Sequence, residues 1–86
     1  MQLTTSQKAD EELSKMDSQL ARLFAKRMQK IASMPPRRHL KLGLPYNVED
    51  VTRQARMVYG IEGEEIRVVH CFATHKEYEK WYNFFK

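Results

Sequence analysis

Two strand-forming segments separated by a short turn constrain the fold of this chain more than any other feature. The segments TRQARMVYGI (residues 52–61) and EIRVVHCFA (residues 65–73) are rich in β-branched and aromatic residues. The sequence EGEE between them is typical of a hairpin turn, because Gly63 can adopt a positive φ angle. We therefore expect an antiparallel hairpin with a two-residue turn at Glu62-Gly63. The predicted pairs are Tyr59 with Ile66, Met57 with Val68 and Arg56 with Val69.

The alternation of side chains along these strands predicts two faces with different character. The first face is strongly apolar, and its predicted members are Ala55, Met57, Tyr59, Ile61, Ile66, Val68, His70 and Phe72. The second face is predicted to carry Gln54, Arg56, Val58, Arg67, Val69, Cys71 and Ala73. Because an apolar face has to be covered, we expect the N-terminal part of the chain to pack on the first face.

Residues 6–33 have the apolar spacing of a helix. The apolar residues at three- and four-residue steps are Leu13, Met16, Leu20, Leu23, Phe24, Met28 and Ile31. One continuous helix would be about 42 Å long at 1.5 Å per residue, which is too long for so small a domain. A break near Asp17 or Ser18, either of which can cap a new helix, predicts two antiparallel helices. Their predicted bounds are 6–15 and 18–33.

Three shorter segments complete the predicted sheet. Residues 2–5, QLTT, are expected to form a short edge strand, and residues 44–50 are expected to form a loop. Residues 38–42, RHLKL, alternate in polarity and are predicted to form a further strand. If its leucines face the helices, His39 and Lys41 join the second face.

A final helix is predicted from a capping signal followed by an aromatic stripe. Thr74 and Glu77 form the pattern T-x-x-E, so we expect the helix to begin at His75. The aromatic residues on one side of this helix are Tyr78, Trp81, Tyr82 and Phe85.

These elements predict one α+β domain spanning residues 1–86. We expect two N-terminal antiparallel helices packed on one face of a small antiparallel sheet of three to four strands, with a short C-terminal helix. No apolar run approaches the roughly 20 residues that span a bilayer. The single cysteine, Cys71, cannot form an internal disulfide, and the N-terminus lacks a signal-peptide pattern. A cytoplasmic protein without membrane partners is therefore expected.

Five basic or ionisable groups are predicted to share the second face without an acid: His39, Lys41, Arg56, Arg67 and His75. Arginine matches phosphate oxygens with a planar fork of donors, and histidine can protonate a leaving oxygen near neutral pH. In RNA the neighbouring 2′-OH can serve as the nucleophile. The chain lacks the H-x-x-x-H and C-x-x-C spacings of metal ligands. We therefore expect metal-independent phosphodiester chemistry without a cofactor.

Several of these residues also have an ordinary structural interpretation. His70 is expected to be a hydrogen-bonded core histidine, and Cys71 a small buried hydrophobe. His75 can simply occupy the first turn of a helix. Tyr78 fits the core by its spacing, although it can also stack on a base.

Three segments of the chain resemble the RelE/ParE superfamily of toxin–antitoxin toxins. SQKADEELSKMD resembles the opening helix of that family, and HLKLGL resembles its "LkG" strand. ARMVYGIEGEEIRVVHCFATHKEYEKWY resembles the C-terminal part, in which a strand beginning with arginine precedes a late histidine or arginine. The resemblance implies the fold described above and a toxin that a cognate antitoxin neutralises.

The nuclease branch of this family cleaves mRNA in the ribosomal A site, so the resemblance implies mRNA on the 70S ribosome as the substrate. It implies that Arg56 stabilises the scissile phosphate, that His75 acts as general acid and that Lys41 is a third catalytic group. The charge pattern adds Arg67, His39, Arg38 and Arg37 as expected RNA or phosphate contacts, and the resemblance adds a C-terminal aromatic residue, either Tyr78 or Tyr82. Some members use a glutamate before the "LkG" strand as general base. This chain has none there, so either His39 or Lys41 deprotonates the 2′-OH, or stabilisation of transition-state charge dominates, as is proposed for members without a base.

Two other functions remain open. The family includes toxins that inhibit DNA gyrase with the same scaffold and without RNA cleavage. The chain can also be an inactive module that binds RNA or a protein partner, because a fold does not fix an activity.

Overall fold

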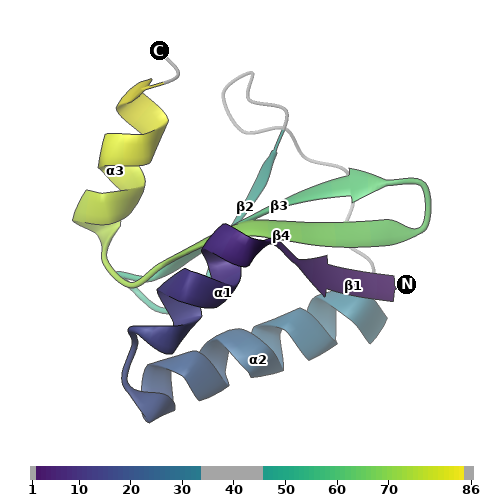
Figure 1. Cartoon of the computed structure of the whole chain (residues 1–86), viewed down its shortest axis with the longest axis horizontal. Helices are drawn as coiled ribbons and strands as arrows, with labels where there is room; N and C mark the ends of the chain where they lie inside the picture. The colour runs from purple at the N-terminus through teal and green to yellow at the C-terminus, as the bar shows by residue number, and fades with distance from the viewer. Residues whose placement is uncertain (1, 34–45, 85–86) are drawn as a thin grey trace.

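The computed structural model describes residues 2–33 and 46–84, which form a four-stranded sheet and three helices (Figure 1). The elements are β1 (Gln2–Thr5), α1 (Gln7–Ser14), α2 (Ser18–Ser33), β2 (Asn47–Asp50), β3 (Arg56–Glu62), β4 (Glu65–Phe72) and α3 (His75–Phe84). The strand order is β1-β4-β3-β2. The predicted α+β class is confirmed, but the sheet is mixed, because β1 runs parallel to β4.

The two N-terminal helices begin at polar caps, of which the sequence predicts only the one near Asp17 or Ser18. Ser6 caps α1, because its hydroxyl oxygen accepts a hydrogen bond from the Ala9 N–H at 3.0 Å. Asp17 caps α2, because Oδ1 accepts from the Leu20 N–H at 2.9 Å. None of the helices among the described residues is long and apolar enough to cross a membrane.

The middle of the chain differs from the prediction. Residues 47–50, expected in a loop, form β2 and pair with β3, with Val48 opposite Val58. Their sequence NVED has little strand propensity, so these residues form a strand because they pair with β3. The predicted strand 38–42 lies outside the described residues. Residues 52–55 form a turn before β3, in which the Ala55 N–H donates to Thr52 Oγ1 at 2.9 Å.

The predicted turn of the β3–β4 hairpin is wrong by one residue, and the strand pairs shift with it. The turn lies at Gly63-Glu64, where Gly63 has a φ of 59°, so that Glu62 opposes Glu65. Glycine adopts this backbone conformation without a steric penalty, which places it first in the turn. Ile61 and Tyr59 therefore pair with different partners than expected. The observed pairs are Ile61 with Ile66 and Tyr59 with Val68.

A β-bulge at Val69 reverses the faces of the last part of β4. The register shifts between Val58 and Tyr59, so Val69 has no partner in β3. Beyond the bulge, the pairs are Met57 with Cys71, Val58 with His70 and Arg56 with Phe72. Cys71 therefore joins the first face, and His70 joins the second face together with Phe72, the reverse of the prediction.

Helix α1 stabilises this bulge with polar groups. Pairing between β1 and β4 ends at Val68, so the following edge of β4 lies beside α1 instead. The Ser6 hydroxyl donates to the Val69 carbonyl at 3.0 Å, and the Ser6 N–H donates to the Val68 carbonyl at 2.9 Å. The Glu12 carboxylate accepts from the Cys71 N–H at 2.9 Å. Two side chains thus satisfy backbone groups that a longer β1 would otherwise pair.

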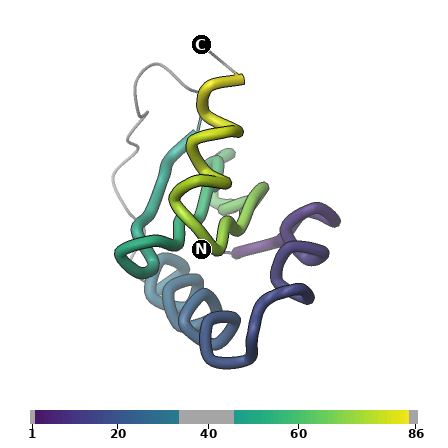
Figure 2. Tube along the Cα trace, turned by 90° about the vertical axis from the view of Figure 1, so that its left-hand side faces the viewer, coloured from purple at the N-terminus to yellow at the C-terminus, as the bar shows by residue number. Residues whose placement is uncertain are grey.

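The two faces of the sheet carry separate clusters of apolar side chains. On the first face, α1 and α2 cover the sheet, and the buried residues are Ala9, Phe24, Ile31, Ala55, Met57, Tyr59, Ile66, Val68 and Cys71. On the second face, Val58 and Phe72 pack against Tyr78 of α3. Figure 2 shows α3 at one end of the molecule and α1 and α2 at the other. The predicted cover of the first face by the N-terminal helices is confirmed.

Helix α3 begins at His75, as the capping signal predicts. The Thr74 hydroxyl oxygen accepts from the Glu77 N–H at 3.2 Å and donates to Glu77 Oε1 at 3.1 Å. The carboxylate therefore binds the hydroxyl rather than the Thr74 N–H that a complete capping box would use.

Replacing Ser6 by alanine is expected to lower the free energy of unfolding by about 1–2 kcal/mol, because the change removes the cap of α1 and the donor to the bulge. Urea denaturation followed by circular dichroism measures the change. Ser14→Ala is the control, because the Ser14 hydroxyl is exposed and only donates to the Glu11 carbonyl in the same helix. Equal stability of wild type and Ser6→Ala would show that the bulge does not depend on this side chain.

Candidate active site

The guanidinium of Arg56 is held by its own loop and by the neighbouring strand. Asp50 lies opposite Arg56 in the β2–β3 pair, and its Oδ1 is 3.0 Å from Arg56 Nε. Nη1 donates to the carbonyls of Thr52, Arg53 and Ala55, each at 3.0 Å. The Arg56 side chain is only 14% exposed. The predicted absence of acids is therefore wrong at this position, because the formation of β2 brings a carboxylate to the arginine.

His75 is also paired with a carboxylate. Its Nε2 lies 2.9 Å from Oε1 of Glu79, one turn further along α3. Its Nδ1 is buried and has no hydrogen-bond partner within the described part of the chain. The contact is a hydrogen bond when the hydrogen of the ring is on Nε2.

Tyr78 lies next to both groups. Its ring centroid is 5.9 Å from that of His75. Burial raises the pKa of the Tyr78 hydroxyl, the neighbouring Tyr82 raises it further, and the Arg56 cation opposes both effects. Arg56 is thus within electrostatic reach of a tyrosine that contacts the histidine ring. Arg56 is paired with Phe72, whose ring lies 6.3 Å from that of Tyr78, so Arg56, Tyr78 and His75 lie on the same side of the sheet.

The remaining candidates are not gathered at this position. Arg67 is exposed and lies opposite Gly60, four residues along β3 from Arg56. At 3.3 Å per residue the two arginines are about 13 Å apart along the sheet. Arg67 thus lies toward the hairpin end of β4. The other candidates, Arg37, Arg38, His39 and Lys41, lie outside the described residues.

His70 is an ionisable group on the second face that sequence alternation places wrongly. Its Nδ1 is 3.3 Å from each Glu12 carboxylate oxygen. Its ring stacks on Phe72, with centroids 4.9 Å apart and planes 15° from parallel, and lies 5.5 Å from Trp81. No local signal identifies this pair, because Glu12 and His70 are 58 residues apart and meet only through the bulge.

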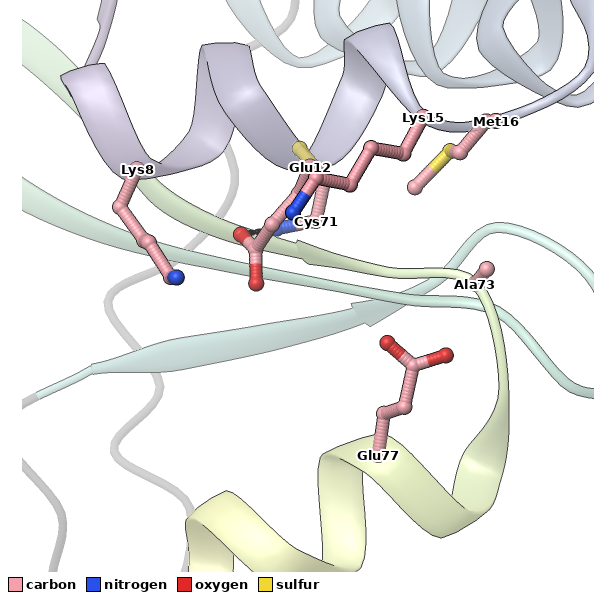
Figure 3. Close-up of a pocket in the computed structure, with 7 residues that line it drawn as sticks. All are labelled: Lys8, Glu12, Lys15, Met16, Cys71, Ala73 and Glu77. Atoms are coloured by element: carbon pink, nitrogen blue, oxygen red, sulfur yellow. Dashed lines mark hydrogen bonds between the residues drawn. The ribbon is translucent and has the colours of Figure 1, made fainter.

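A pocket of about 360 Å³ lies between α1 and the start of α3 (Figure 3). It is lined by Lys8, Glu12, Lys15, Met16, Cys71, Ala73 and Glu77. Two ammonium and two carboxylate groups line it, so it has no dominant charge. Burial raises the pKa of the Cys71 thiol to about 12, and the nearby carboxylates of Glu12 and Asp10 contribute to the shift. The thiol is therefore not a nucleophile at neutral pH.

Comparisons with known proteins identify the fold. No protein-family model matches the chain, and no curated protein matches it by sequence. Among solved structures, it is similar to a YoeB/ParE toxin from Agrobacterium tumefaciens, with a TM-score of 0.70, 16% identity and coverage of 84% of this chain and 96% of that chain. It is also similar to the YoeB-YefM toxin-antitoxin complex from Staphylococcus aureus, with a TM-score of 0.67, 17% identity and coverage of 84% and 94%. The chain has the RelE/ParE toxin fold.

The resemblance drawn from the sequence is thereby confirmed at the level of the fold. A third solved structure, a metal-bound toxin from Helicobacter pylori, matches with a TM-score of 0.68, 23% identity and coverage of 90% of this chain and 97% of that chain. Within residues 2–33 and 46–84 of this chain, no three histidine, cysteine, aspartate or glutamate side chains gather into a group that could hold a metal ion.

The buried thiol predicts a pH dependence of stability. The pKa of Cys71 is raised from 9.0 to about 12 in the folded state, so the unfolded chain loses this proton first. Between these values the folded state binds more protons, and the free energy of unfolding falls as the pH rises. We expect Cys71→Ala to show a shallower fall just above pH 9 in urea denaturation, with its stability at pH 7 as the reference. An unchanged slope would show that the thiol ionises normally in the folded protein.

Proposed function

We propose that this chain is the toxin of a toxin–antitoxin system and acts as a ribosome-dependent mRNA endonuclease in the cytoplasm. Two findings support the proposal: the RelE/ParE fold, and the placement of Arg56, Tyr78 and His75 on one face. The second finding carries the enzymatic part, because phosphodiester cleavage needs a cation and a proton donor at the same phosphate.

In the proposed reaction the 2′-oxygen of RNA attacks the adjacent phosphorus. The new P–O2′ bond forms as the P–O5′ bond breaks, which leaves a 2′,3′-cyclic phosphate and a free 5′-hydroxyl. Arg56 stabilises the charge that develops on the phosphate oxygens, and His75 donates its Nε2 proton to the departing 5′-oxygen. The base that takes the 2′-OH proton is assigned to His39 or Lys41, and no metal takes part.

The two carboxylates at the site have to be displaced by RNA. Asp50 and Glu79 are 69% and 56% exposed, so both carboxylates can turn into solvent when a phosphate binds. A phosphate that replaces Asp50 supplies the negative charge that the mostly buried Arg56 guanidinium would otherwise lose. Both carboxylates also repel RNA, so binding to this face depends on the ribosome for further contacts.

A cognate antitoxin is part of the proposal. The similar toxin from Staphylococcus aureus was solved in complex with YefM, its antitoxin, in a heterotetramer. We expect the gene for this chain to lie beside a short frame that encodes an acidic, amphipathic partner.

Arg56→Ala and His75→Ala are each expected to abolish mRNA cleavage. The loss of Arg56 should raise the barrier by on the order of 2–4 kcal/mol, as the loss of other charge-stabilising donors does. The measurement is primer extension on cellular mRNA after induction, repeated on programmed ribosomes with the purified protein.

The matched control is Arg53→Ala. Arg53 is exposed, and only its main-chain carbonyl contacts Arg56, so its replacement should preserve both fold and cleavage. Thermal denaturation of each variant separates loss of fold from loss of chemistry. Growth arrest with intact mRNA and unchanged translation would reject the nuclease. Salt-sensitive RNA binding without cleavage on programmed ribosomes would instead indicate the inactive binding module.

One observation favours the alternative of a gyrase inhibitor. Arg56 is mostly buried and bonded to three carbonyls and to Asp50, which is the environment of a structural arginine. If the chain is a gyrase inhibitor, His75→Ala would leave toxicity largely intact, and the purified protein would inhibit DNA supercoiling by gyrase. The nuclease hypothesis predicts neither outcome.

A further inference from the structure

Helix α2 carries as much positive charge as the net charge of the whole chain. The chain has a net charge of +4. Helix α2 contains four cations, Arg22, Lys26, Arg27 and Lys30, and no acid. The other residues therefore balance to zero, and the positive excess of the chain lies on one helix. This helix packs on the first face, on the side of the sheet opposite to the candidate active site.

Three of these cations form a row along the exposed side of α2. Arg22, Lys26 and Lys30 follow one another at four-residue intervals, which places them about 6 Å apart along the helix axis. All three are exposed, and none forms an ion pair with another residue in the described ranges. Arg27 differs, because its Nη1 is 3.0 Å from Glu49 Oε1.

Two cations of the row, Lys26 and Lys30, line a small pocket together with two aliphatic side chains and Arg27. The pocket has a volume of about 240 Å³, and its lining residues are Leu23, Lys26, Arg27, Lys30 and Val51. Leu23 is 43% exposed, whereas Phe24 and Ile31 on the same helix are buried against the sheet. Leu23 therefore does not belong to the core. It contributes apolar surface beside three cations.

We propose that this α2 surface, defined by Leu23, Val51 and the cations Arg22, Lys26 and Lys30, binds an acidic amphipathic polypeptide segment. An aliphatic side chain of the partner occupies the pocket, and carboxylates one helical turn apart bind the row of cations. The exposed leucine distinguishes this partner from nucleic acid, because a phosphate backbone uses the cations and leaves Leu23 without a partner. The assignment of the segment to the antitoxin rests on the proposed function.

The position of the surface determines what such a partner does. Helices α2 and α3 lie on opposite sides of the sheet (Figure 2). A segment bound to α2 therefore lies on the first-face side, whereas Arg56 and His75 lie on the side of α3. The segment therefore anchors the partner without covering the catalytic groups. A neutralising antitoxin has to continue around the sheet to reach them, and binding in two places raises its overall affinity.

The test uses the whole protein and a fluorescently labelled synthetic helix of about 18 residues, long enough to form a helix. In this peptide leucines form one side and glutamates flank them. Binding is followed by fluorescence anisotropy at low and physiological salt. We expect Lys26→Glu and Leu23→Ser each to weaken binding by about tenfold or more, because charge and aliphatic contact both contribute. Lys80→Glu on α3 is the matched control and should leave binding unchanged.

A duplex RNA serves as the competing probe. Failure of the peptide to bind, or binding unaffected by Leu23→Ser, would overturn the proposal. RNA binding that Lys26→Glu weakens and Leu23→Ser does not affect, together with no peptide binding, would identify a nucleic-acid surface instead. Circular dichroism confirms that the variants fold. The cleavage assay is separate: a wild-type protein without nuclease activity would reject the proposed enzyme and leave the α2 surface in place.

Discussion

The contact between α1 and the bulged edge of β4 is the interaction on which the rest of the structure depends. Ser6 and Glu12 bind the backbone of residues 68–71, where β1 has ended and no strand pairs with this edge. One extra residue in a strand exchanges its inward and outward side chains. By stabilising the bulge, α1 determines that Cys71 lies in the helix-covered core and that His70 faces the other side of the sheet.

This exchange shapes the candidate active site. With Phe72 on the second face, α3 has an aromatic surface on which Tyr78 packs, and this contact places α3 and His75 on the same side of the sheet as Arg56. Three ionisable groups of the second face then lie close to a carboxylate: Arg56 to Asp50, His75 to Glu79 and His70 to Glu12. Arg67 is exposed and forms no ion pair with the described residues. The site is therefore a set of ion pairs that a bound phosphate has to rearrange, rather than an uncompensated cationic surface.

The two sides of the sheet differ in the charge that they present. Arg56, His70 and His75 on the second face lie beside carboxylates, whereas the row on α2 has no carboxylate partner among the described residues. Long-range electrostatic attraction depends on uncompensated charge, which is why the acidic partner is proposed for α2. The proposed binding surface and the proposed catalytic groups therefore lie on opposite sides of a small domain.

The sequence alone determined the features that depend on neighbouring residues. The helix caps at Asp17 and Thr74 and the apolar spacing of α2 could be predicted, because a cap or a helical turn involves residues within four positions. Tertiary structure decided β2, the hairpin register and the bulge, because each depends on cross-strand pairing. It also decided the contact between Glu12 and His70, which are 58 residues apart. Alternation along a strand assumes a regular ladder, and one inserted residue invalidates every assignment beyond it.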